Sequence, residues 1–296
     1  MQLKLNKYMI IEITSTNIQQ IRDQYFINEL VIGFFDGIHL GHMSLLSNPE
    51  NRSILTFKRI PRKTKNLFEF DERIQQLEDL GFKNIFVYDI FENNLIGTEF
   101  IEQILAPLSP NKIIVGANFT YGNDRCNAYS LKKYFNVEIK EITYNISTSR
   151  IKELIINKQI ELANELLIKP YYRVGNVVYG NQIARSLGFN TANILCDNSL
   201  IDIAEGVYQA EVVFDNQKYD SVVYLGIPKT IHSRSYSMIE AHILNFSQDI
   251  YCKEIKIIFL KYLAPNLKFN SVNELTNAIK KYIKLILNKK KNNFGI

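Results

Sequence analysis

The spacing of apolar residues changes near residue 170 and divides the 296-residue chain into two regions of different architecture. Before residue 170, short apolar runs alternate with segments of helical periodicity. After it, strand-like runs follow one another closely, separated by glycine or Asn-Gln turns. Alternating strands and helices favour a parallel sheet covered by helices, whereas closely spaced strands favour an antiparallel barrel or sandwich. We therefore predict an α/β protein with two domains, residues 1–169 and 170–296.

The first region contains four apolar runs that predict buried strands: ELVIGFF, SILTF, NIFVYDI and NKIIVGANF. Between them, DERIQQLEDLG has helical spacing from Ile74 onward and ends at Gly81, which suits an amphipathic helix with a glycine stop. GTEFIEQILAPL predicts a helix that starts from Thr98 as N-cap and stops near Pro107. Two further helices are predicted over SRIKELIINKQIELANELLIKP.

The second region predicts strands over YRVGNVVYG, GVYQAEVVF, KYDSVVYLG, SMIEAHILNF and EIKIIFLKYL. The last stretch, SVNELTNAIKKYIKLILNKK, returns to helical spacing. We expect an antiparallel β-structure that ends in a helix.

Composition narrows the class of protein. A hydrophobic content of 46% is ample for a core, no apolar run is long enough to span a membrane, and the N-terminus lacks the order of a secretory signal. The cysteines are odd in number and widely spaced, which argues against a disulfide framework and a thiolate zinc site. The net charge of +5 is modest and part of it lies in Lys289–Lys291. We expect a cytoplasmic protein without nucleic-acid or membrane partners; the sequence leaves its oligomeric state open.

The stretch VIGFFDGIHLGHMSLL places two of the four histidines three residues apart, directly after a predicted strand. A strand ending at Gly33 and a helix beginning near Gly41 would put His39 and His42 at a first helical turn, where free amides and the helix dipole favour an anion. Gly41 has no side chain to keep a nucleotide from the backbone. Histidines at this spacing can point to one side and donate hydrogen bonds to phosphoryl oxygens in a transition state.

Two other interpretations of the histidine pair stay open on spacing alone. Both rings can be polar packing at the start of a helix, because short motifs match by chance. Two histidines three apart on a helix can also share a metal ion, although no third ligand is evident nearby in the sequence.

The stretch GFFDGIHLGH resembles the first signature of the bifunctional bacterial riboflavin kinase/FMN adenylyltransferases, also called FAD synthetases, which are HxGH nucleotidyltransferases. The resemblance continues in order along nearly the whole chain, through LTF, FIEQIL, VGANFTYG, ISTSRIKELI, LGFNTANI, GVYQAEVV and IEAHILNF. It implies a Rossmann-like nucleotidyltransferase domain with a parallel sheet, followed by an antiparallel β-barrel riboflavin kinase domain that ends in a helix.

For the first domain, the resemblance implies transfer of AMP from ATP to the phosphate of FMN, giving FAD and pyrophosphate. His39 and His42 match the family's phosphate-binding pair, and Arg150 offers a fork for pyrophosphate oxygens. FMN supplies its own nucleophilic oxygen, so the protein need only align the phosphates, hold Mg²⁺ and stabilise charge. The other residues implied in nucleotide or flavin binding are Gly33, Phe35, Asp36, Gly41, Asn118, Ser147, Thr148 and Ser149.

For the second domain, the resemblance implies phosphorylation of the ribityl 5′-hydroxyl of riboflavin with ATP and Mg²⁺. Thr191 and Asn193 match the family's metal and phosphate residues, and a spacing of two would place both on one face of a strand. Glu240 matches the family's base, although a structural ion pair is the ordinary explanation of such a residue. The residues implied in nucleotide binding here are Gly180, Arg185 and Gly188.

The chain departs from the family pattern in both halves. Lys58-Arg59-Ile60-Pro61 stands where the family usually has a Pro-His-Pro segment, so a family histidine is missing. Thr56 also follows His42 by only 14 positions, which is short for a helix and a loop. In the second half, the family's usual basic residue, glycine and proline are replaced by Ile183, Ala184 and Asn190.

The resemblance implies a two-step enzyme that makes FMN from riboflavin and then FAD from FMN, with ATP as co-substrate and Mg²⁺ as cofactor. One alternative is a monofunctional FMN adenylyltransferase whose C-terminal barrel only binds flavin, which the departures in the second half motivate. A third interpretation is a non-catalytic flavin or nucleotide binding module, which the missing histidine motivates. The expected small-molecule partners are riboflavin, FMN and ATP.

Overall fold

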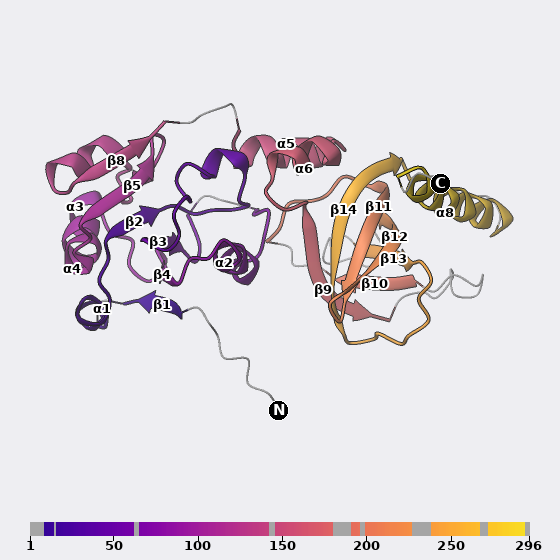
Figure 1. The fold of residues 1–296 in the computed structure, drawn as a ribbon, viewed down its shortest axis with the longest axis horizontal. Coiled ribbons are helices and arrows are strands. Elements are labelled where there is room, and N and C mark those ends of the chain that lie inside the picture. The colour runs from indigo at the N-terminus through magenta and orange to yellow at the C-terminus, as the bar shows by residue number, and fades with distance from the viewer. Residues whose placement is uncertain are drawn as a thin grey trace. The chain divides into compact units, whose positions relative to one another are not determined.

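The computed structural model describes residues 9–14, 16–61, 65–141, 146–179, 191–195, 199–226, 238–266 and 272–293. The chain divides into two compact units, residues 1–148 and 149–296 (Figure 1). The helices α5 (Thr148–Ile156) and α6 (Ile160–Leu166) fall almost wholly in the second unit. Asn164 ties α6 to that unit, because its side-chain amide donates to the carbonyl of Phe259 and accepts from the amide of Tyr171. The domain boundary that the sequence suggests at residue 169 stays a prediction.

The first unit is built on a six-stranded sheet whose paired strands are all parallel, in the order β1-β4-β3-β2-β5-β8. Its strands are β1 (Met9–Ile13), β2 (Glu29–Ile32), β3 (Arg52–Phe57), β4 (Asn84–Tyr88), β5 (Lys112–Gly116) and β8 (Val137–Lys140). A small hairpin pairs β6 (Thr120–Tyr121) with β7 (Cys126–Asn127). Its helices are α1 (Ile18–Gln24), η1 (Leu40–His42), α2 (Phe70–Asp79), α3 (Gly97–Phe100), η2 (Ile101–Leu105), α4 (Ala106–Leu108) and η3 (Ala128–Lys133).

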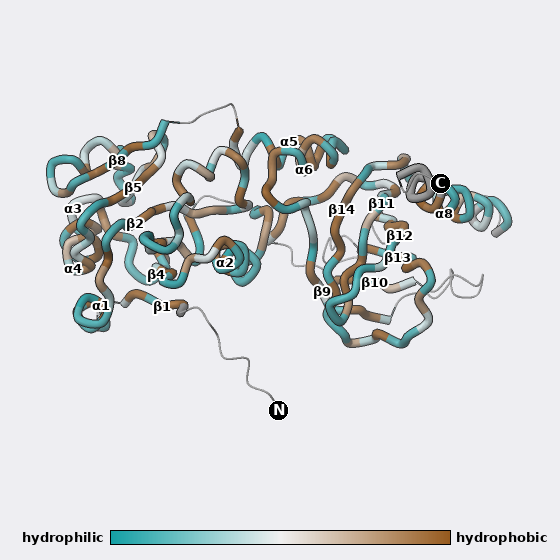
Figure 2. The backbone as a smooth tube through the Cα atoms, in the orientation of Figure 1, coloured by the Kyte–Doolittle hydropathy of each residue, from teal (hydrophilic) through white to brown (hydrophobic). Residues whose placement is uncertain are grey.

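The four predicted strands of this unit are confirmed as β2 to β5, and they are central because their apolar residues are buried on both faces. Leu30, Val31 and Ile32 of β2 are all inaccessible to solvent, as a parallel strand covered on both sides requires. Figure 2 shows the contrast with α1, whose residues are mostly hydrophilic. The outer strands β1 and β8 were not predicted.

The two helices predicted between the strands of this unit are confirmed, with one difference in detail. α2 ends at Asp79, and Gly81 has the positive φ of +97° expected of a glycine stop. The second helix begins at Gly97 rather than after Thr98, because the carboxylate of Glu99 accepts from the amide of Ile96 and so places the N-cap two residues earlier than expected. Its middle, η2, is π-helical, and the helix continues through Pro107 to Leu108.

The second unit is a closed antiparallel barrel with the strand order β10-β13-β12-β11-β14-β9. Its five predicted strands are confirmed as β9 (Tyr172–Val178), β11 (Gly206–Phe214), β12 (Gln217–Gly226), β13 (Met238–Ile243) and β14 (Glu254–Ala264), and β10 (Thr191–Leu195) is a sixth. Closure leaves the barrel without a free sheet edge. The terminal helix α8 (Val272–Asn293) packs on β12 through a cluster of Val207, Val222, Leu244, Tyr282 and Ile286. No helix in the described part of the chain is long and apolar enough to cross a membrane.

Candidate active sites

The histidine pair follows β2, at the point where the strand order of the sheet reverses. β3 and β4 lie on one side of β2, whereas β5 lies on the other. In open parallel sheets, ligands bind outside the carboxyl ends of the strands at such a switch point. The segment from Gly33 to His42 follows the end of β2, and Asn118 follows the end of β5. The fold therefore brings these two predicted segments to one end of the sheet.

The predicted α-helix after Gly41 is wrong. The chain forms only η1, a three-residue 3₁₀ turn, in which the amide of His42 bonds the carbonyl of His39 at 2.8 Å. Few residues are available before β3 begins at Arg52, so the chain turns back instead of forming a helix. So short a turn has no appreciable macrodipole, so the predicted phosphate site would depend on side chains.

The expectation that both histidines point to one side is confirmed. The rings of His39 and His42 are stacked, with centroids 3.7 Å apart and planes inclined by 17°. His39 is 4% exposed, and burial lowers its pKa to about 4. The ring of His39 is therefore neutral at pH 7 and presents one N–H donor and one acceptor nitrogen.

The neighbouring glycines make room for rings. A Cβ at Gly33 would lie 2.6 Å from the ring of Phe35, and one at Gly41 would lie 3.1 Å from the ring of His39. Phe35 is buried, has a positive φ of 52° and packs its ring edge-on against His42 at 5.4 Å. Such a φ is uncommon for a residue with a side chain and marks local strain. Gly33, Phe35 and Gly41 thus shape the histidine pair, and direct contact with a nucleotide stays a prediction.

Asp36 is 1% exposed, and its Oδ1 accepts from the amides of Leu67 at 2.8 Å and Phe68 at 3.3 Å. The carboxylate therefore joins the Gly33–His42 segment to the chain before α2. Its predicted role in nucleotide binding is not tested by these contacts.

A cavity of about 520 Å³ opens beside this segment, at the carboxyl ends of the central strands. Aromatic rings and several polar side chains share its wall, and a cavity of this size and character suits a planar aromatic ligand. Asn118 and Arg125 line it, and the predicted role of Asn118 in nucleotide or flavin binding stays a prediction. The aromatic lining residues were not identified from the sequence: Phe34, Phe57, Tyr88, Phe100, Phe119 and Tyr121.

The segment that replaces the family's Pro-His-Pro also reaches this cavity. Ile60 and Pro61 line it, whereas Arg59 pairs with Asp89 at 2.6 Å and lies over the ring of Phe91. The chain therefore supplies apolar side chains to the wall where the family histidine is missing.

Arg73 of α2 organises the ends of the two strands that meet the cavity. Its guanidinium is buried and donates to the carbonyl of Phe34 at 2.7 Å, to that of Phe57 at 3.1 Å and to that of Lys58 at 2.9 Å. It also lies over the ring of Phe34, 4.0 Å from its centroid. Burial lowers the pKa of Arg73 to about 10, so the group remains charged at neutral pH.

A second buried arginine supports the turn that carries His42. Arg52 donates to the carbonyl of Leu45 at 3.0 Å and to that of Ser47 at 2.7 Å, and the amide of Leu45 donates to the carbonyl of His42 at 2.9 Å. The hydrogen bond of Arg52 to Glu29, 2.7 Å long, lowers the pKa of that carboxyl. Arg52 thus satisfies the carbonyls of Leu45 and Ser47, which would accept backbone hydrogen bonds if the chain continued as a helix here.

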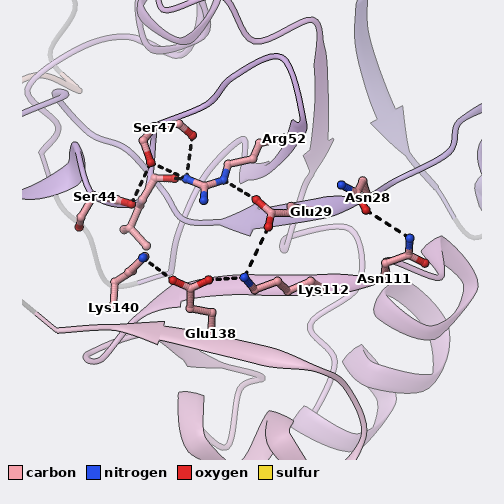
Figure 3. Close-up of polar contacts among 10 residues, drawn as sticks. Asn28, Glu29, Ser44, Ser47, Arg52, Asn111, Lys112, Glu138 and Lys140 are labelled. Atoms are coloured by element: carbon pink, nitrogen blue, oxygen red, sulfur yellow. Dashed lines mark hydrogen bonds and ion pairs between the residues drawn. The ribbon is translucent and has the colours of Figure 1, made fainter.

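Figure 3 shows that this arginine is one end of a chain of charges across the sheet. Glu29 lies between Arg52 and Lys112, and Glu138 lies between Lys112 and Lys140. Hydrogen bonds from the two lysines lower the pKa of Glu138 to about 2. Strands β3, β2, β5 and β8 are joined by side chains as well as by their backbone ladders.

The predicted phosphate residues around α5 are partly exposed. Ser147 precedes α5, Thr148 is its first residue, and Ser149 and Arg150 follow on its first turn. Arg150 donates to Glu153 at 2.8 Å in an exposed pair, which contributes little to stability and leaves the guanidinium accessible to an anion. A role of Arg150 toward pyrophosphate stays a proposal.

In the barrel, the cross-strand register brings together three of the predicted kinase residues. Asn193 of β10 is directly opposite Glu240 of β13, and Thr191 is opposite His242. Directly opposite side chains share a face and have Cβ atoms about 5 Å apart. Thr191, Asn193 and Glu240 therefore form one group, as the spacing of two and the family resemblance predict.

Gly180, Arg185 and Gly188, together with the departures Ile183, Ala184 and Asn190, lie outside the described residues. A separate cavity of about 110 Å³ in the barrel unit is lined in part by Thr191, Phe246 and Tyr251. Among the described residues, no group of three or more His, Cys, Asp or Glu side chains is placed to hold a metal ion.

The first unit is a parallel sheet with a histidine pair at its switch point, and the second is a closed antiparallel barrel that groups Thr191, Asn193 and Glu240. This combination is that of a two-unit nucleotide-dependent transferase. Comparison with known proteins identifies both units: residues 24–159 match the family model of FAD synthetase, and residues 167–289 match that of riboflavin kinase.

The whole-chain relatives agree with the two family models. A bifunctional riboflavin kinase/FMN adenylyltransferase of Mycoplasma pneumoniae is 33% identical over 84% of this chain and 93% of its own length. That of Bacillus subtilis is 28% identical over 88% of this chain and 92% of its own. The trifunctional protein RibF/MnmA of Mycoplasmoides gallisepticum is 42% identical, and the match covers 91% of this chain but only 41% of that longer protein.

A solved structure has the same fold. The crystal structure of a macrolide-efflux protein from Streptococcus pneumoniae matches with a TM-score of 0.81 and 26% identity, over 92% of this chain and 96% of that one. Together with the relatives, these matches give the assignment. The chain belongs to the family of bifunctional riboflavin kinase/FMN adenylyltransferases.

Proposed function

We propose that this chain makes FAD in two ATP-dependent steps: the barrel unit phosphorylates riboflavin to FMN, and the α/β unit adenylylates FMN to FAD and releases pyrophosphate. The observation that carries the proposal is that each unit groups a set of family residues at one place, the stacked histidines in one and the row of Asn193 and Glu240 in the other. A family match in each half favours this function over the monofunctional alternative.

In the adenylyl transfer, an oxygen of the FMN phosphate attacks the α-phosphorus of ATP. The bond from that phosphorus to the bridging oxygen breaks, and pyrophosphate leaves with the electron pair. No protein nucleophile is needed, because FMN brings its own. His39 and His42 donate hydrogen bonds to the phosphoryl oxygens as their charge grows, and Arg150 binds the leaving pyrophosphate.

The cavity beside the histidines receives the flavin ring of FMN. Phe119 and Tyr121 lie nearly parallel on its wall, with centroids 6.2 Å apart and planes inclined by 17°. Asn118 offers an amide to the polar edge of the ring system. Phe34 in the cavity wall and Phe35 against His42 are consecutive residues, so flavin and phosphate sites are joined through one short segment.

In the kinase step, Glu240 takes the proton of the ribityl 5′-hydroxyl, whose oxygen then attacks the γ-phosphorus of ATP, and ADP leaves. The hydroxyl of Thr191 and the amide oxygen of Asn193 are oxygen donors of the kind that fit Mg²⁺ beside phosphate oxygens. Mg²⁺, when bound there, supplies charge neutralisation at the transferred phosphate. The cytoplasmic address and the expected lack of nucleic-acid and membrane partners stay predictions.

Separation of the flavin products tests the proposal. Purified protein is incubated with riboflavin, ATP and Mg²⁺, and riboflavin, FMN and FAD are resolved by chromatography. Accumulation of FMN followed by FAD supports both steps. FAD from supplied FMN but none from riboflavin would leave only the adenylyltransferase, and no product from either flavin would refute the proposal.

A further inference from the structure

Tyr224 of β12 has a buried hydroxyl that makes no hydrogen bond to any part of the chain that the structure describes. Native proteins pair nearly all buried polar atoms, because an unpaired one loses its bonds to water and gains none in return. Phenylalanine at this position would fill the same space without that cost. The described part of the fold therefore gives no reason for the hydroxyl.

The register of the barrel places Tyr224 beside the proposed base. Tyr224 is directly opposite Glu240 on the neighbouring strand, and Glu240 is directly opposite Asn193 on the next. The three residues form a row across β12, β13 and β10, with adjacent strands about 4.8 Å apart. A ligand that meets Glu240 is within reach of both neighbours in this row.

The surroundings of Tyr224 set the chemistry that its hydroxyl can perform. Burial raises the pKa of Tyr224, and the nearby Tyr282 and Glu240 raise it further. The phenol therefore keeps its proton at neutral pH and serves as a hydrogen-bond donor and acceptor, not as a base. Its ring packs against the apolar cluster beneath α8, which includes Val222 and Tyr282 and holds the side chain in place.

We propose that Tyr224 is a substrate-positioning residue of the kinase step, whose hydroxyl bonds the ribityl chain of riboflavin beside Glu240. The ribityl chain is a row of alcohols, each a donor and an acceptor, and its terminal hydroxyl is the one that reacts. A neutral phenol next to the base pairs with a neighbouring alcohol and orients the reacting one. This inference rests on the proposed function of the barrel unit.

The test is Tyr224→Phe, which removes only the oxygen. We expect the KM for riboflavin to rise about tenfold, as for loss of one hydrogen bond of about 1.4 kcal/mol. The KM for ATP and the conversion of FMN to FAD should stay unchanged. The melting temperature should stay the same or rise, because the variant no longer buries an unpaired hydroxyl.

Tyr208→Phe is the matched control within the same barrel. The hydroxyl of Tyr208 is paired, since it donates to the carbonyl of Ala204 at 2.6 Å. Its removal should lower the melting temperature and leave the KM for riboflavin unchanged. The two variants thus delete the same atom from the same residue type with opposite expected effects.

Flavin binding identifies the part of the substrate that Tyr224 contacts. Quenching of flavin fluorescence gives the affinity for riboflavin and for lumiflavin, which has the same ring system without the ribityl chain. Tyr224→Phe should weaken riboflavin about tenfold and leave lumiflavin unchanged. Equal weakening of both would refute a ribityl contact.

Two further results would overturn the inference. One is a Tyr224→Phe variant with wild-type kinetics for riboflavin; the other is a variant that loses stability and both activities together, which would make the hydroxyl structural. A wild-type chain that does not phosphorylate riboflavin would refute the proposed function itself, so the two failures are distinguishable.

Discussion

The imidazole rings of His39 and His42 stack at a centroid distance of 3.7 Å, which makes a doubly protonated pair unfavourable. Burial lowers the pKa of His39 to about 4, so this ring stays neutral across the physiological range. In the proposed reaction, His39 therefore serves phosphate as a neutral hydrogen-bond donor.

The buried His39 predicts a pH dependence of stability. Its pKa is about 4 in the folded chain and about 6.5 in the unfolded chain, so the unfolded chain binds more protons between these values. Stability is therefore full above pH 6.5 and falls as the pH drops toward 4. From pH 7 to pH 5, the wild type should lose about 2 kcal/mol more of its unfolding free energy than His39→Gln, which has no ring to protonate.

Urea denaturation followed by circular dichroism at pH 7, 6 and 5 measures this difference, since the chain has no tryptophan to report by fluorescence. The transition to compare is that of the α/β unit. Parallel loss of stability in wild type and His39→Gln over this range would contradict a neutral, buried His39.

Arg52 should support adenylyl transfer without touching substrate. Arg52→Lys keeps a charge beside Glu29 but lacks the fork that holds the carbonyls of Leu45 and Ser47. We expect kcat for FMN adenylylation to fall roughly tenfold while riboflavin phosphorylation is unchanged. The control is Lys112→Met, which breaks the same chain of charges but contacts no atom of the turn. If both variants affect kcat equally, the turn is not what Arg52 supports.

The aromatic cavity should determine the affinity for FMN. Phe119→Ala removes one face of the wall, and we expect the KM for FMN to rise about tenfold because ring burial and stacking are lost. Phe26→Ala is the control, since Phe26 is a phenylalanine of the same unit that is 79% exposed. Steady-state kinetics with FMN as the varied substrate measure both; similar KM values for the two variants would place the flavin elsewhere.

Glu240 should act in one step only. Glu240→Gln keeps the size of the side chain and removes the base, so kcat for riboflavin phosphorylation should fall roughly a hundredfold or more. Conversion of FMN to FAD should be unaffected. Glu254→Gln on β14 provides an exposed carboxylate for comparison. Loss of both activities in Glu240→Gln would show damage to the fold instead of loss of a base.

Hydrophobic spacing and glycine positions in the sequence predicted those strands and helices whose structure depends on their own residues. The run from Leu30 to Ile32 is apolar without alternation and is buried on both faces, and Gly81 ends α2 with a positive φ. The group of Thr191, Asn193 and Glu240 was predicted in part, because the spacing of Thr191 and Asn193 places both on one face of a strand. That Glu240 lies opposite Asn193 depends on strand pairing and entered only through the family resemblance.

The η1 turn, the cavity lining and the environment of Tyr224 could not be predicted from the sequence, because they depend on the strand order and on long-range contacts. The turn at η1 is held by Arg52, ten positions after His42, so local spacing alone suggested a helix. Phe57 and Phe119 look like core residues in the sequence, and only the strand order reveals that they face a cavity. No sequence signal shows that the hydroxyl of Tyr224 lacks a hydrogen-bond partner among the described residues, because the side chains on neighbouring strands decide this.

Product analysis of His42→Ala tests the role of the stacked histidines in adenylyl transfer most directly. His42→Ala is incubated with riboflavin, ATP and Mg²⁺ beside the wild type, and the flavins are separated over time. The wild type should accumulate FMN and then FAD, whereas His42→Ala should form FMN at the wild-type rate and accumulate it without FAD. FAD formation by His42→Ala at the wild-type rate would contradict the claim that the stacked histidines carry adenylyl transfer.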